Sequence, residues 1–316
     1  MADPLAAVFR RPFPEQVAAF RLRLGNLVPT ARWDDLWQEA HDRAFMVAGA
    51  TKADLLADLA GAVDKAISEG RSIEEFRADF RTAVEKHGWH GWTGEDTAAG
   101  QAWRTRVIYR TNARTTYAAG RYAQLQEGGF AYWVYRHGGS LEPREQHLAW
   151  DGLILEADHL FWQTHYPPNG WGCSCYVTGA RSIEAARRRG GDPAVELGDG
   201  WRQPDAKTGA PEGIDRGWAY APGRSVAEDV TRMVAEKRSR LPQALGAALA
   251  GVATPGRAVT FEELLAEFET VLKARSPAEA ERLIEELVAR LPESERPTAR
   301  DMLSEVYLEV ASSRPT

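Results

Sequence analysis

Two cysteines separated by a single residue, Cys173 and Cys175, constrain the fold of this chain more than any other feature. In an extended segment, residues i and i+2 project from the same face, so both thiols can reach one metal ion. The run Pro167-Pro-Asn-Gly170 just before them predicts a tight turn that holds the pair in place. The surrounding stretch, 128–179, is rich in loops and poor in aliphatic side chains. Small units of this kind often depend on a bound metal.

The residue types around this pair favour a zinc site over a disulfide. A disulfide between the two cysteines would close a very small, strained ring, and a reducing compartment disfavours it further. Zinc prefers thiolate and imidazole ligands in a closed tetrahedron. The candidate ligands are His147, His159, His165, Cys173 and Cys175. The sequence leaves open which of the histidines bind, and whether Asp158 replaces one of them.

The motifs of catalytic zinc sites are not matched. A zinc deaminase carries His-x-Glu and Pro-Cys-x-x-Cys, whereas here Glu145 precedes His147 and the cysteines are one residue apart. The sequence contains neither the His-Glu-x-x-His of metalloproteases nor a Gly-x-Ser-x-Gly elbow. Four protein ligands would leave no open coordination position, so a structural zinc is expected.

Upstream of the cysteine region, apolar residues recur at helical spacing. The first predicted helix starts near Thr51, stops at Gly70 and is carried by Leu55, Leu56, Leu59, Val63 and Ile67. Ser72 and Glu75 form a capping box that predicts the start of a second helix. A third helix is expected from about Thr97 to Gln126.

The third predicted helix carries a row of arginines: Arg106, Arg110, Arg114 and Arg121. No acidic residue lies between Asp96 and Glu127, and at 100° per residue the arginines fall within one narrow stripe. One interpretation is a solvated helix face. The other is a docking surface for DNA phosphates or for an acidic neighbouring subunit.

The stretch from Gly128 to Gly179 changes to a small β region. The run Ala131-Tyr-Trp-Val-Tyr-Arg136 is aromatic and β-branched, which predicts a strand, and Tyr176-Val177 could begin another. The chain contains eleven tryptophans, most of them before the cysteines. Rings at this density suit cores and subunit interfaces, and ordinary core packing explains most of them equally well.

The C-terminal part is predicted to be helical. A short basic helix over 182–189 precedes an extended or flexible linker over 190–224 and a helix over about 225–240. Capping boxes at Thr260/Glu263 and Ser276/Glu279 then open a three-helix bundle. The expected fold class is α+β and mostly helical. It comprises an N-terminal irregular or helical arm (1–50), a central domain (51–181) with N-terminal helices, a small β region and the metal site, a linker with short helices (182–259), and the C-terminal bundle (260–316).

Charge and hydropathy exclude some classes of protein. The net charge is −6, so any contact with nucleic acid has to be local. The sequence shows no secretory signal and no apolar window of about 18 residues, so we expect no membrane association and synthesis in the cytoplasm.

The residues from about Tyr109 to Val177 resemble the phage Mu F-like head morphogenesis family. Arg110-Thr-Asn-Ala-Arg114 and Tyr117 match its helix rich in Arg, Thr and Asn, and Trp133-Val-Tyr135 matches its aromatic strand. Arg144-Glu-Gln-His147, Asp151-Gly152, His165-Tyr-Pro-Pro-Asn-Gly-Trp171 and Cys173-Ser-Cys175 match the elements that follow. Ser174 departs from the family pattern, in which an Arg is common at that place, but the departure leaves the ligands intact.

The resemblance implies a minor capsid protein of a phage or prophage, not an enzyme. Such a protein would act in procapsid assembly or in the early handling of packaged DNA. It would lie in the virion, in the capsid interior or at the portal vertex, and in the host cytoplasm before assembly. The expected partners are the portal protein, the major capsid protein or a scaffold, and also packaged DNA; no small-molecule substrate is expected.

Two other functional classes compete with this interpretation. A zinc-dependent enzyme acting on nucleic acid would use Glu145 or Asp151 beside the metal as acid or base. A DNA-binding module would use the arginine row together with Arg187-Arg-Arg189.

Overall fold

The computed structural model describes residues 12–140, 142–240, 282, 284 and 285. The chain divides into two compact units, Met1–Glu228 and Asp229–Thr316. The first unit contains the described helices that precede Arg224, the sheet and the loop with the two cysteines, and it is mixed α+β, as expected. The predicted C-terminal bundle over 260–316 lies outside the described residues, apart from 282, 284 and 285. Among the described helices, none combines the length and the apolar character that crossing a membrane requires.

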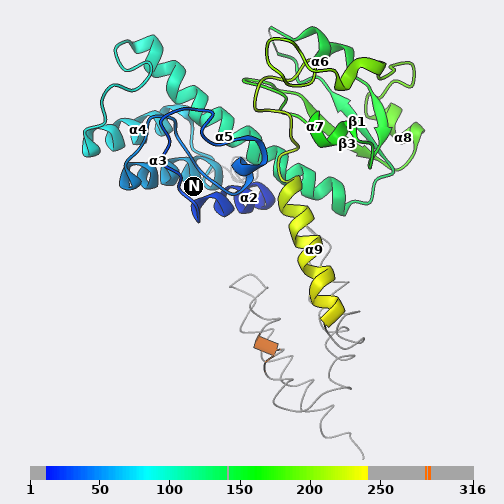
Figure 1. Ribbon diagram of the computed structural model, residues 1–316, viewed down its shortest axis with the longest axis horizontal. Coiled ribbons are helices and arrows are strands. Elements are labelled where there is room, and N and C mark those ends of the chain that lie inside the picture. The colour runs from blue at the N-terminus through cyan, green and yellow to red at the C-terminus, as the bar shows by residue number, and fades with distance from the viewer. Residues whose placement is uncertain (1–11, 141, 241–281, 283, 286–316) are drawn as a thin grey trace, which may run out of the picture. The chain divides into compact units, whose positions relative to one another are not determined.

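The helical part of the first unit consists of α2 (Pro14–Leu24), η1 (Gln38–Asp42), α3 (Ala53–Ser68), α4 (Ile73–His87) and α5 (Ala98–Glu127) (Figure 1). Its core is formed where apolar faces of these elements meet, with Phe20, Leu56, Leu59, Phe76 and Phe80 at 0–2% exposure. Phe20 comes from the segment that was expected to be an N-terminal arm. Residues 12–50 are therefore part of the packed unit, because their scattered apolar side chains complete the core of α3 and α4.

Local signals predicted α3 and α4 correctly. The side chain of Ser72 accepts a hydrogen bond from the backbone N–H of Glu75 (3.2 Å), and the Glu75 carboxylate accepts one from the backbone N–H of Ser72 (2.8 Å). These two bonds satisfy backbone donors at the start of α4 that have no partner within the helix.

Ser72→Ala is expected to lower the free energy of unfolding by about 1 kcal/mol, because it removes one bond of the capping box and weakens the other. Urea denaturation measures the change. Ser140→Ala is the matched control, since Ser140 is exposed in a loop. Equal stability of the two variants would contradict the prediction.

The helix α5 has 30 residues and begins at the predicted place, with Thr97 as its N-cap. Its N-terminal half packs on α3 and α4, and its C-terminal half reaches the β region (Figure 1). α2 approaches α5 closely at Gly120, where an added Cβ would lie 2.8 Å from the backbone nitrogen of Gln16. A single long helix thus connects the helical core to the cysteine region.

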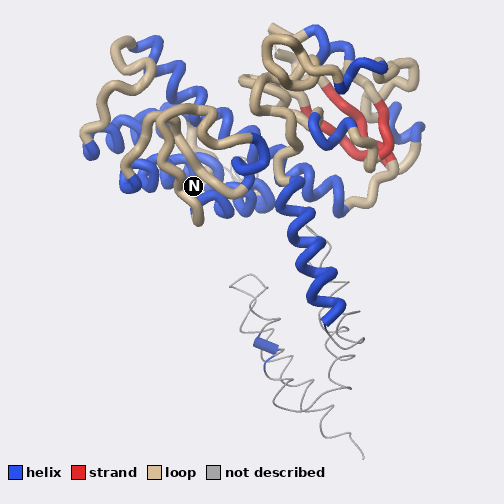
Figure 2. Tube along the Cα trace, in the orientation of Figure 1, coloured by secondary structure: helices blue, strands red, loops and turns tan. Residues whose placement is uncertain are grey.

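The β region is a three-stranded antiparallel sheet in the order β2-β1-β3 (Figure 2). The strands are β1 (Tyr132–Arg136), β2 (Ile154–Glu156) and β3 (Tyr176–Ala180). The predicted strands correspond to β1 and β3, while β2 was not predicted. Trp133 and Tyr135 belong to the aromatic core on one face, and Val134 packs with Ala180 and Ala186 on the other. Both faces of β1 are therefore covered, which explains a run of residues without polar alternation.

Short helices surround the sheet: α6 (Glu145–Ala149), α7 (Phe161–Thr164), α8 (Ile183–Arg188) and η2 (Asp199–Arg202). The predicted basic helix corresponds to α8, which packs on β1 and β3. Aromatic rings fill the core beside α6 and α7, among them Trp133, Trp150, Trp162 and Tyr166. In the β region, most of the tryptophans that precede the cysteines are therefore core residues.

The structure differs from the linker predicted over 190–224. Ile214, Trp218, Tyr220 and Ala221 are 2–6% exposed, and Ile214, Trp218 and Ala221 belong to the aromatic core. The sequence of this segment is rich in turn-forming residues and shows no helical or strand periodicity, which is why it was predicted to be a linker. Its few apolar residues are nevertheless buried in the structure. After it comes α9 (Arg224–Arg240), which agrees with the predicted helix.

Candidate metal centre

The loop between α7 and β3 presents the two cysteines. Cys175 is followed directly by β3, whose first residue is Tyr176, and Cys173 lies two positions earlier. Both are free thiols and both are buried, with exposures of 4% and 9%. The pairing of β3 with β1 fixes the end of this loop, so the positions of the thiols follow from the sheet.

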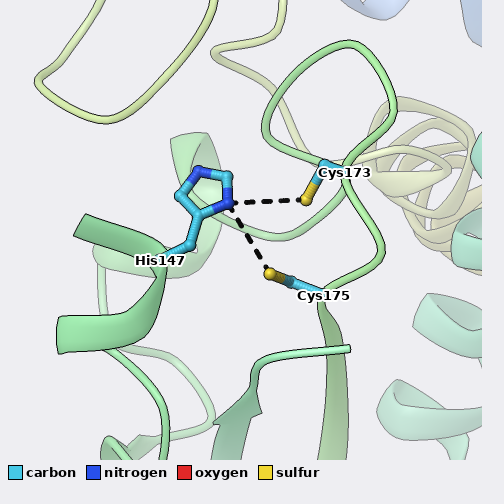
Figure 3. A group of neighbouring side chains, drawn as sticks. All are labelled: His147, Cys173 and Cys175. Carbon is cyan, nitrogen blue, oxygen red and sulfur yellow. Dashed lines mark hydrogen bonds between the residues drawn. The ribbon is translucent and has the colours of Figure 1, made fainter. Parts of the chain in front are cut away.

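The buried side chain of His147, on α6, completes a three-residue group with the cysteines (Figure 3). The Nδ1 atom lies 3.7 Å from Cys173 Sγ and 3.6 Å from Cys175 Sγ. The three possible ligand atoms all lie within 4.8 Å of one another. One ion could contact all three after small side-chain adjustments, because zinc–ligand bonds are about 2.0–2.3 Å long.

A backbone carbonyl orients the imidazole of His147. Its Nε2 atom lies 2.9 Å from the carbonyl oxygen of Gly213, which can only accept a hydrogen bond. Nε2 therefore carries the hydrogen, and Nδ1 presents its lone pair to the sulfurs. Histidines that bind metals are commonly oriented in this way by a partner of the second ring nitrogen.

Gly213 has φ +82, and an added Cβ would lie 2.7 Å from the Trp150 ring. This position therefore requires glycine, both for its backbone conformation and for the space available.

The two thiols influence each other strongly. A hydrogen bond from Cys175 is the largest cause that lowers the pKa of Cys173, to about 4. The neighbouring Cys173 in turn raises the pKa of Cys175, because a second negative charge at this distance is unfavourable. A divalent cation between the sulfurs would remove this repulsion and allow both to bind as thiolates.

An ion pair ties the cysteine loop to the start of α6. The carboxylate oxygen Oδ2 of Asp215 accepts hydrogen bonds from Arg144 Nη2 (2.6 Å) and from the backbone N–H of Trp171 (2.8 Å). The backbone N–H of Asp215 donates to the carbonyl of Asn169 (3.0 Å). Asp215 thus connects α6, the loop before the cysteines and the segment that contains Gly213.

The structure places the other two predicted histidines outside the three-residue group. His165 is fully buried, stacks on Phe161 at 4.5 Å between ring centroids, and has Nδ1 2.8 Å from the Thr164 hydroxyl. Burial lowers the pKa of His165 to about 4. His159 is half-buried and its Nδ1 accepts a hydrogen bond from the backbone N–H of Phe161. Asp158 is exposed.

The predicted arginine row is divided between two environments. Arg106 and Arg110 are exposed on α5. Arg114 is half-buried and donates to the carbonyls of Gly172 (2.6 Å) and Cys173, so it supports the cysteine loop. Arg114 and Arg121 also line a cavity of about 590 Å³ between α5 and this loop. Part of the row is therefore structural, and part remains available to a ligand.

The two carboxylates of the enzyme hypothesis lie elsewhere. Asp151 accepts hydrogen bonds from Arg136 Nε (2.9 Å) and from the backbone N–H of His137 (2.8 Å). Glu145 is exposed on α6. Neither belongs to the group formed by His147 and the cysteines.

Gly138→Ala is expected to disturb the cysteine loop, because an added Cβ would lie 1.9 Å from the Ser174 carbonyl oxygen. Since the obstacle is backbone, we expect a loss of about 2–3 kcal/mol in the free energy of unfolding, typical of overpacking. Thermal and urea denaturation measure it. At Gly198 an added Cβ meets nothing within 4 Å, so Gly198→Ala serves as the control. A Gly138→Ala protein as stable as the control would refute the close approach.

Sequence reasoning missed Gly213 and Asp215. Both lie in the segment that was predicted to be a linker, more than 60 positions after His147 in the chain. The neighbouring Ile214, Trp218 and Tyr220 were the available signal, because aromatic residues are uncommon in flexible linkers.

Comparison with known proteins places these residues in context. Residues 57–178 match the family model described as phage Mu protein F like protein, a range that contains His147 and both cysteines. The chain is 34% identical over 250 residues to the putative capsid assembly protein F of Escherichia phage Mu, which covers 69% of this chain and 56% of the relative. It is 40% identical over 167 residues to the Mu-like prophage FluMu F protein of Haemophilus influenzae, which covers 51% of this chain and 40% of the relative.

The chain thus spans about half the length of these curated relatives. No solved structure matches it significantly.

Proposed function

Because the chain belongs to the phage Mu protein F-like family through residues 57–178, we propose that it is a minor capsid protein of a phage or prophage. The observation that carries this proposal is the 34% identity to a relative named as a putative capsid assembly protein, extending over 69% of the chain. In this role the protein contributes contacts to an assembling particle and has no catalytic activity of its own.

We further propose where it acts. The protein takes part in procapsid assembly, in the capsid interior or at the portal vertex, and contacts the portal protein, the major capsid protein or a scaffold. An assembly role is compatible with the first unit, which is compact and has its own aromatic core.

We propose that His147, Cys173 and Cys175 bind one structural zinc ion. Two thiolates and one imidazole suit zinc, and the Gly213 carbonyl already orients the imidazole. A tetrahedral ion would take one further ligand beyond these three. Catalytic zinc sites also use three protein ligands, so the structural role is supported by the surroundings: the three residues are 2–9% exposed, and Asp151 is engaged by Arg136.

The α5 arginines support a second candidate function, in which the protein contacts packaged DNA. Arg106 and Arg110 are exposed, and Arg114 and Arg121 line the 590 Å³ cavity. If all four neutralise phosphates, the logarithm of the DNA affinity should fall with the logarithm of the salt concentration with a slope of about −3 to −4. Fluorescence anisotropy with a labelled duplex measures this slope, and binding independent of salt would exclude the arginines as phosphate contacts.

The capsid role is tested by deleting the gene in the phage or prophage that encodes it and supplying the protein from a plasmid. We expect the deletion to abolish DNA-filled heads, the plasmid to restore them, and purified procapsids to contain the protein. Filled heads at the normal titre after deletion, or procapsids without the protein, would overturn the proposal.

A further inference from the structure

A second feature of the first unit lies apart from the candidate metal ligands: a partly open cavity of about 100 Å³ lined by the N-terminal segment, α5 and the residues around Trp218. Its lining is mostly apolar, and none of the described residues that form it is an Asp or a Glu. It does contain two arginines, Arg23 and Arg104.

The two guanidinium groups are buried without a carboxylate in contact. Arg104 is 8% exposed, and its Nη2 donates to the carbonyl of Ala48. Arg23 is 3% exposed and donates to the side-chain oxygens of Asn112 (3.3 Å) and Thr115 (3.1 Å). The Nε atom of each has no hydrogen-bond partner among the described residues.

Burial lowers the pKa of both arginines, and for Arg104 it is the only cause. Arginine nevertheless stays charged in proteins. A buried cation without a counter-charge is unfavourable, so the cavity is suited to an anion.

The acidic group that acts on Arg23 through space is already engaged. The Asp42 carboxylate accepts hydrogen bonds from the backbone N–H of Gly223 (2.9 Å) and from the Ser225 hydroxyl (3.0 Å). It raises the pKa of Arg23 through space but has no such effect on Arg104. His41, which also lines the cavity, has its pKa lowered to about 4 by burial and adds no positive charge at neutral pH.

Partly exposed tryptophans lie at the rim of the cavity. Trp33, Trp37 and Trp171 are 38%, 40% and 42% exposed. The ring of Trp33 lies 6.3 Å from Trp37 and 5.8 Å from Trp171, so the three form one continuous aromatic surface. Exposed clusters of tryptophan are typical of binding sites for protein partners, where tryptophan and arginine dominate the binding energy.

We propose that this cavity and its tryptophan rim bind a segment of a partner protein that presents an Asp or Glu beside an apolar side chain. The carboxylate enters the cavity and pairs with Arg104 and Arg23, and the apolar side chain packs on Trp33 and Trp37. The geometry favours a peptide over nucleic acid, because DNA-binding arginines form exposed strips, whereas these two are buried.

The test uses the full-length protein and a displayed library of random 12-residue peptides. Peptides selected on the wild type are expected to contain an Asp or Glu next to an apolar residue, and replacing that acid by its amide should weaken binding at least about tenfold. Selected peptides without an acid, or no enrichment of any peptide, would overturn the proposal. So would stronger competition by inorganic phosphate or an oligonucleotide than by the acidic peptide.

Variants connect the binding to the cavity. Arg104→Met should weaken the selected peptide at least about tenfold and should fold with a melting temperature equal to or above that of the wild type, because it removes an uncompensated buried charge. Arg106→Met is the matched control, since Arg106 is exposed two positions further along α5.

Trp37→Ala should weaken binding as well, with Trp103→Ala (43% exposed, outside the cavity lining) as its control. Peptide binding unchanged in both Arg104→Met and Trp37→Ala would overturn the proposal. These experiments measure only peptide binding, so a failure of this proposal can be distinguished from a failure of the capsid-assembly proposal.

Discussion

Cys173→Ser is expected to release about one zinc ion per chain and to lower the melting temperature of the first unit by about 10 °C. Structural zinc contributes folding free energy directly, on the order of 10 kcal/mol in small zinc domains. Here a buried aromatic core around Trp133 also stabilises the region, so we expect a smaller loss of roughly 3–4 kcal/mol, which corresponds to that temperature shift in a domain of this size. Cys175→Ser and His147→Ala should behave in the same way, because all three residues belong to one group.

Elemental mass spectrometry of the purified protein measures the zinc, and calorimetry measures the melting temperature. His159→Ala is the control, since His159 is a histidine of the same region that lies outside the group. It should retain the metal and most of the stability. Wild-type protein without zinc after purification in metal-replete buffer would sink the zinc proposal. Loss of zinc from His159→Ala equal to that from Cys173→Ser would show that the ligand set is wrong.

Trp133→Ala is expected to lower the free energy of unfolding by about 3–5 kcal/mol, the range for truncating a large buried aromatic side chain. Trp133 is 1% exposed in β1, and the centroid of its ring lies near those of Tyr122 (5.6 Å), Trp162 (5.5 Å) and Tyr166 (5.9 Å). These rings come from α5, α7 and the loop that leads to the cysteines. The substitution therefore leaves a cavity where three segments meet.

Urea denaturation followed by circular dichroism measures this loss. Trp103→Ala provides the matched comparison, because Trp103 is the same residue type on α5 but 43% exposed, and we expect a change within about 0.5 kcal/mol. Similar losses for the two tryptophans would mean that the aromatic core does not hold the β region together.

The helices that the sequence predicted are those whose signals are local. In α3 and α4, apolar residues repeat along one face of the helix. The start of α4 is marked by the capping box, a motif that spans only the four positions from Ser72 to Glu75. Interactions between neighbours in the chain dominate these elements, so their bounds could be read from the sequence. The strand β2 has only three residues and pairs with β1, so it has no period of its own to detect.

For the candidate metal site, too, the local sequence predicted one part and tertiary contacts decided the other. The spacing of Cys173 and Cys175 and the nearby histidines were enough to predict that the two thiols and an imidazole lie together, as they do in the structure. The choice among the histidines was not predictable, because it depends on α6 and on the carbonyl of Gly213, 66 positions away from His147. His165 has the same side chain but lies after α7, where its ring stacks on Phe161.

The sequence by itself determined the residue types of the site, the main helices and the family resemblance, because each is encoded by neighbouring positions along the chain. Only the tertiary structure decided that residues 190–224 pack on the cysteine region and that Arg23 and Arg104 share one cavity. Contacts between distant segments bury these side chains, although the residues beside them in the sequence show no helical or strand periodicity. The free energy of this burial depends on how the whole unit packs, so neighbouring positions in the sequence do not reveal it.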